Sequence, residues 1–144
     1  MKFLTLEQGQ LGAVVEEVVV DLVEASQVMG ENIRVNSLMQ LVEMGDETAK
    51  AAWALAQRAA VHGCATRVFA DVKPLAPLPQ PRRNIFCLGK NYLEHAKEIV
   101  GQLDKGEEIP QKPIVFTKST SSVTGPKMPI PSQSELTSKL DYEA

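Results

Sequence analysis

The sequence predicts a mixed α+β fold, and three features support that prediction. Two runs rich in β-branched residues, 12–15 and 18–20, flank an acidic pair near the N-terminus. An alanine-rich stretch follows at 48–60, and alanine is the best helix former. Two further apolar runs, 84–88 and 114–117, have the length of strands. We therefore expect a small α+β domain first and strands of a second domain after it.

The N-terminal segment is expected to form strands. Residues 3–6 alternate weakly between apolar and polar positions. Gly12–Leu22 predicts a hairpin that turns near Glu16 and Glu17, although this acidic pair is poor turn chemistry. Residues 67–72 predict a further strand.

Two helices are expected between these strands. Asn36 or Ser37 caps the first, which runs to Met44 and stops at Gly45. The second opens at Asp46 or Glu47 and ends at about Ala60. Their expected apolar faces are Leu38, Leu41 and Val42 in the first helix and Trp53, Leu55, Ala56 and Ala60 in the second.

Closely spaced prolines divide the chain. Pro74, Pro77, Pro79 and Pro81 predict an extended segment that is partly polyproline II. We accordingly expect a small domain at 1–73, a linker at 74–83 and a second domain from 84 to 144. In that second domain, a helix capped by Asn91 is expected to run to about Val100.

Composition excludes several classes of protein. The 144 residues carry 15 basic and 18 acidic side chains, a net charge of -3, which disfavours non-specific nucleic-acid binding. The apolar runs are too short to span a membrane, and the N-terminus lacks a signal-peptide core. Two cysteines far apart in sequence fit a reduced, cytoplasmic setting.

Five residues are candidates for chemistry. His95 and Glu98 lie three apart on the expected helix, so the carboxylate can orient the imidazole as a general base, although such pairs are commonly solvated surface groups. Lys118 precedes a hydroxyl-rich loop that can offer donors to an anion, or that is simply a polar connection. Asp141 and Glu143 alternate onto one strand face, where carboxylates can bind Mg²⁺ or Mn²⁺ or remain surface charges.

These residues fall in motifs that resemble the fumarylacetoacetate hydrolase family. Gly89, Asn91, Tyr92, His95 and Glu98 meet a Gly-x-Asn-Tyr-x-x-His-x-x-Glu pattern after an apolar strand. Further on, 112–118 resembles the family's Pro-x-x-Phe-x-Lys segment, 121–126 the loop after it, and 141–144 the start of an Asp-Tyr-Glu-x-Glu-Leu strand. The first 73 residues resemble the small N-terminal domain of bacterial members.

The resemblance implies a fold, a chemistry and a set of roles. It implies a β-rich catalytic fold after the linker, and Mg²⁺- or Mn²⁺-dependent cleavage of small oxo-acids. His95 and Glu98 would activate water, Lys118 would lie near the substrate, and Glu143 would be the first metal ligand. The leading activity is hydrolysis of an acylpyruvate-type 1,3-dioxo acid. Oxaloacetate decarboxylation, hydroxymuconate isomerisation or decarboxylation, and oxo-acid dehydration are alternatives. A homodimer is the default for the full enzyme.

The family's remaining metal ligands would lie at position 145 and beyond. The chain is therefore identified as an N-terminal portion, truncated before the metal site is complete. Because hard cations need several oxygen ligands, we expect the chain alone to be inactive. The second hypothesis is a non-catalytic interaction module that pairs through its unfinished sheet and binds neither metal nor oxo-acid.

Overall fold

The structure, a computed structural model, describes residues 1–92 and 112–140. The chain divides into two compact units: Met1–Pro79 together with Thr124–Ala144, and Gln80–Val123. The described residues contain helices and two small antiparallel sheets, so the expected α+β class is confirmed. Within those residues no helix is long and apolar enough to cross a bilayer.

The first unit is built on a four-stranded sheet of order β1-β2-β3-β4, with every neighbouring pair antiparallel. Its strands are β1 Phe3–Thr5, β2 Leu11–Val15, β3 Val18–Asp21 and β4 Thr66–Val68. The predicted hairpin is confirmed, because Val15 pairs with Val18 around the acidic turn. Glu16 accommodates the tight turn in the left-handed region, at a φ of 53°.

Three helices follow the hairpin: α1 Leu22–Val28, α2 Leu38–Met44 and α3 Asp46–Val61. The sequence analysis did not foresee α1. Asp21 caps it by accepting from the backbone N–H groups of Val23 and Glu24. Glu24 lies three residues after Asp21, so the sequence held the signal of a capping box here. Ser37 caps α2 as expected, and Gly45 ends it.

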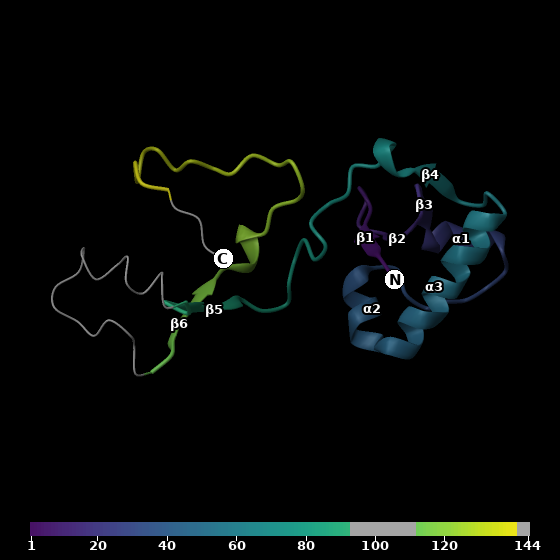
Figure 1. Cartoon of the computed structure of the whole chain (residues 1–144), viewed down its shortest axis with the longest axis horizontal. Helices are drawn as coiled ribbons and strands as arrows, with labels where there is room; N and C mark the ends of the chain where they lie inside the picture. Colours follow the sequence, from purple (N-terminus) through teal and green to yellow (C-terminus); the bar gives the residue numbers. More distant parts are fainter. Residues whose placement is uncertain (93–111, 141–144) are drawn as a thin grey trace. The chain divides into compact units, whose positions relative to one another are not determined.

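The sheet buries side chains on both faces. Helices cover one face over a core that includes Leu11, Val20, Leu22 and Leu55 (Figure 1). Leu4, Leu6, Val19 and Val72 form a smaller cluster. These side chains alternate along the strands with those of the helical core, so they lie on the opposite face.

Two expectations in this unit are wrong. Val42 is 64% exposed, because α2 buries the side that carries Leu41 and partly Leu38. The strand expected at 67–72 ends at Val68, and the 3-10 turn η1 Phe69–Asp71 follows. The turn brings Val72 back to the sheet, where its side chain is 8% exposed. Burial of Val72 is therefore achieved by a turn and not by a longer strand.

The second unit holds a two-stranded antiparallel sheet, β5 Ile85–Gly89 and β6 Ile114–Lys118. Both strands lie where the apolar runs predicted them. The 3-10 turn η2 Thr120–Ser122 follows β6. The helix expected from Asn91 to about Val100 and the strand expected near the C-terminus lie largely outside the described residues.

Candidate active site

Of the five residues singled out from the sequence, the structure describes Lys118. The other four, His95, Glu98, Asp141 and Glu143, lie outside the described residues. Lys118 is the last residue of β6, and its side chain is exposed to solvent. Its ammonium lies 5.3 Å from the centre of the Phe116 ring, two residues earlier on the same face of the strand. This cation–π contact directs the lysine side chain along the sheet surface.

The strand register places Lys118 relative to the start of the expected helix. Lys118 pairs with Ile85, and Gly89 pairs with Ile114 at the other end of the sheet. The rise of about 3.3 Å per residue puts Lys118 about 13 Å along the strand from Ile114. Gly89, the last residue of β5, therefore lies at the end of the sheet opposite Lys118.

The hydroxyl-rich loop after Lys118 is organised by its own hydrogen bonds. Ser119 Oγ accepts from the backbone N–H of Ser121, and the two hydroxyl oxygens lie 2.9 Å apart. Ser122 Oγ donates to the Ser119 carbonyl at 2.7 Å. These contacts define the turn η2. The hydroxyl groups of these three serines are therefore engaged within the loop.

The described residues do not themselves form a metal centre. Among residues 1–92 and 112–140, no group of three or more His, Cys, Asp or Glu side chains is arranged to hold an ion. A hard divalent cation takes six or more oxygen ligands in proteins. The described part of the chain therefore does not fit a resident Mg²⁺ or Mn²⁺ by itself.

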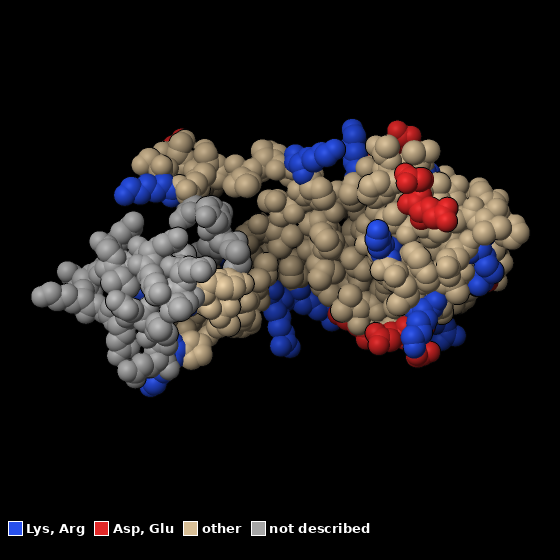
Figure 2. Space-filling model, in the orientation of Figure 1, with Lys and Arg blue, Asp and Glu red and all other residues tan. Residues whose placement is uncertain are grey.

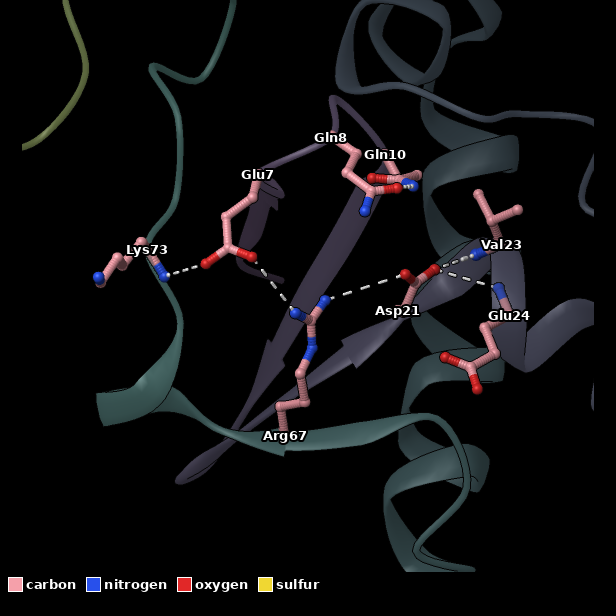
Figure 3. A network of polar contacts seen from close by, with 8 residues as sticks. All are labelled: Glu7, Gln8, Gln10, Asp21, Val23, Glu24, Arg67 and Lys73. Atoms are coloured by element: carbon pink, nitrogen blue, oxygen red, sulfur yellow. Dashed lines mark hydrogen bonds and ion pairs between the residues drawn. The ribbon is translucent and has the colours of Figure 1, made fainter.

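A second polar cluster lies on the first unit, far along the chain from the predicted site. The Arg67 guanidinium lies 3.7 Å from a Glu7 carboxylate oxygen and 4.0 Å from an Asp21 oxygen (Figure 3). Gln8 and Gln10 help to line the small recess beside it, which has a volume of about 90 Å³. Asp21 also caps α1, so this arrangement joins a helix start, a turn and an edge strand. We interpret it as a structural clamp.

The charged surface is mixed. On the face drawn in Figure 2, basic and acidic side chains of the first unit are interspersed with uncharged surface. No extensive basic surface is visible there, which agrees with the net charge of -3.

Comparison with known proteins identifies the family. Residues 84–144 match the family described as fumarylacetoacetate (FAA) hydrolase C-terminal. Oxaloacetate tautomerase YisK of Bacillus subtilis is 37% identical over 152 residues, which is 99% of this chain and 49% of the tautomerase. The chain belongs to the fumarylacetoacetate hydrolase family. This confirms the resemblance drawn from the motifs at 89–98, 112–118 and 141–144.

Other relatives agree with this assignment. An uncharacterised protein of Staphylococcus saprophyticus is 39% identical over 75 residues, covering 52% of this chain and 22% of that protein. A crystal structure from Mycobacterium smegmatis, described as an HpcE protein, matches with a TM-score of 0.53 at 29% identity. That match covers 88% of this chain and 38% of the other. The chain thus spans about half the length of the Bacillus tautomerase and less of the other two.

Proposed function

We propose that this chain contributes catalytic residues to a divalent-metal-dependent enzyme of small oxo-acids. The observation that carries the proposal is the family match over 84–144, because it spans His95, Glu98, Lys118 and Glu143. The tautomerase relative extends the likeness over 99% of the chain, so it includes the N-terminal unit. The proposal concerns the protein with its family domain complete.

His95 and Glu98 are proposed as the proton-transfer pair. A carboxylate that accepts from one imidazole nitrogen fixes the tautomer and raises the basicity of the other nitrogen. That free nitrogen can then take a proton from the substrate or from water. From Gly89 to His95 the chain can span at most about 20 Å when extended. This reach exceeds the length of β6, so the register permits the pair and Lys118 to act on one substrate.

Lys118 is proposed to bind a carboxylate of the oxo-acid. Its ammonium is exposed at the end of β6, and the serine hydroxyls beside it are engaged in η2. A lysine ammonium is a compact charge with three donors, which suits a carboxylate held at a strand end. Glu143 is proposed as a metal ligand, together with oxygen ligands outside the described residues. The metal, when bound, would polarise the oxo group and stabilise an enolate.

Oxaloacetate tautomerisation is the reaction we propose first. The relative aligned over 99% of the chain is named for it. The step takes a proton from the carbon next to the oxo group and delivers one to the oxo oxygen, so it needs a base at that carbon and a proton donor at the oxygen. His95 suits the role of the base. Acylpyruvate hydrolysis is the second candidate, because the matching family is described as a hydrolase and a histidine base can equally activate water. Oxaloacetate decarboxylation releases CO2 and leaves the enolate of pyruvate, which a bound metal would stabilise in the same way, and it is the third reaction to assay.

The test compares the 144-residue chain with a version extended through the rest of its reading frame, each with and without Mg²⁺ or Mn²⁺. Enol absorbance follows oxaloacetate tautomerisation, pyruvate release follows decarboxylation, and loss of diketone absorbance follows acylpyruvate hydrolysis. The matched variants are His95→Ala and His62→Ala. His62 is the only other histidine and lies at the end of α3. Removal of a general base is expected to cost about 10²–10⁴-fold in rate.

Two further pairs separate the roles. Lys118→Ala is expected to raise KM more than Lys127→Ala, because it removes an anion contact. Glu143→Gln is expected to raise the metal concentration needed for half activity, whereas Glu135→Gln is not. An extended protein inert toward all three substrates would contradict the proposal and favour a non-catalytic interaction module. Equal activity of the His95→Ala and His62→Ala variants would remove His95 from the mechanism. A homodimer is proposed for the extended enzyme.

A further inference from the structure

The first half of the proline-rich segment is attached to the sheet. The Leu75 N–H donates to the Thr5 carbonyl at 2.9 Å, and the Thr5 hydroxyl donates to the Pro77 carbonyl at 2.6 Å. The Lys73 N–H donates to a Glu7 carboxylate oxygen at 3.2 Å, as Figure 3 shows. β1 is an edge strand, so residues 73–77 run along a sheet edge that would otherwise lack partners on that side.

Burial of side chains supports the same attachment. Val72, just before the segment, is 8% exposed and packs with Leu4, Leu6 and Val19. Ala76 is 4% exposed. A free polyproline linker has a fully solvated backbone and no buried side chains. Residues 73–77 therefore belong to the first unit, and we name them the strap.

Gly125 lies against the strap. A Cβ atom at this position would lie 3.2 Å from the Ala76 nitrogen and 3.6 Å from the Leu75 Cα. The Gly125 φ is outside the left-handed region, so close approach, and not backbone conformation, makes glycine favourable here. Gly125 and the strap both belong to the first unit.

We propose that the strap and Gly125 form a latch at which the chain both leaves and re-enters the first unit. The chain leaves after Pro79 and returns at Thr124, one residue before Gly125. The segment that leaves the first unit and the segment that returns to it therefore lie next to each other on that unit. The latch shortens the free part of the linker to residues that follow the strap.

A disulfide tests the contact between Gly125 and the strap. Leu75→Cys and Gly125→Cys are introduced together into the chain with Cys64→Ala and Cys87→Ala. A Cβ atom at position 125 would lie 3.6 Å from the Leu75 Cα. The Cα–Cβ bond at position 75 adds at most about 1.5 Å, so the two cysteine Cβ atoms would lie within about 5.1 Å, close to the spacing of a disulfide. The control pairs Leu75→Cys with Ser132→Cys, an exposed position further along the same segment. We expect cross-linking at least about tenfold faster in the Gly125 pair, measured by peptide mass mapping. Equal rates, or a pair that stays reduced, would overturn the latch.

Hydrogen exchange of the unmodified chain tests the strap without any substitution. The Lys73 and Leu75 amides donate to Glu7 and Thr5, whereas Arg83 lies beyond the strap. We expect the Lys73 and Leu75 amides to exchange at least about tenfold more slowly than that of Arg83, after correction for intrinsic rates. Exchange of Leu75 as fast as that of Arg83 would show that the strap is free in solution, whatever the cysteine variants do.

Discussion

Replacing Leu55 by alanine tests the core of the first unit. Leu55 lies on α3, is 0% exposed and packs in the cluster between the helices and the sheet. The change removes three carbon atoms, worth about 2.4 kcal/mol at about 0.8 kcal/mol for each methylene. The cavity that remains adds to this cost, and buried leucine-to-alanine changes cost about 2–5 kcal/mol. We therefore expect the free energy of unfolding to fall by about 3 kcal/mol, a large part of a typical 5–15 kcal/mol.

Trp53 provides the assay. It is the only tryptophan in the chain, lies on α3, and meets the Phe3 ring edge-on at a centroid distance of 5.9 Å. Its fluorescence in urea therefore reports unfolding of the first unit alone. With a slope of about 1 kcal/mol per molar urea for a unit of this size, the midpoint is expected to move down by about 3 M.

Val61→Ala is the matched control. Val61 ends the same helix but is 84% exposed, so its truncation is expected to change stability by less than about 0.5 kcal/mol. A loss below about 1 kcal/mol for Leu55→Ala, or an equal loss for Val61→Ala, would refute the packing described here.

Two predictions concern the hairpin and the helix that follows it, and urea unfolding measures both. Asp21→Ala is expected to cost about 1 kcal/mol, and Asp21→Asn much less, because asparagine keeps the side-chain oxygen that caps α1. Equal losses would assign the effect to the lost charge near Arg67 instead. Glu16→Gly is expected to stabilise the unit by about 0.5–1 kcal/mol, because glycine adopts a positive φ without the cost that a side chain imposes. Glu17→Gly is the control, and it should bring no gain.

Local signals predicted most elements of the chain. Ser37 and Gly45 marked both ends of α2, and the alanine-rich run marked α3. Helix α1 was missed because the prediction followed the strongest local pattern in this part of the sequence. Its capping signal at Asp21 directly follows a β-branched run, and the strand preference of that run concealed it.

The sequence could indicate which residue types form the candidate site, but it could not indicate where these residues lie relative to one another. The spacing of Asn91, His95 and Glu98 is a sequence property, and it falls within the residues that match the family, whereas the catalytic roles of His95 and Glu98 stay predictions. The position of Lys118 is not a sequence property. Only the pairing of Lys118 with Ile85 shows that this lysine lies at the opposite end of the sheet from Gly89.

The sequence by itself determined the α+β class, the family and the identity of the candidate catalytic residues, because these depend on residue type at short spacing. The tertiary structure alone decided which residues distant in sequence meet. Examples are Arg67 between Glu7 and Asp21, and the strap between Thr5 and Gly125. The physical reason is that such contacts depend on strand order and on burial of both sheet faces, and neither leaves a periodic signal along the chain.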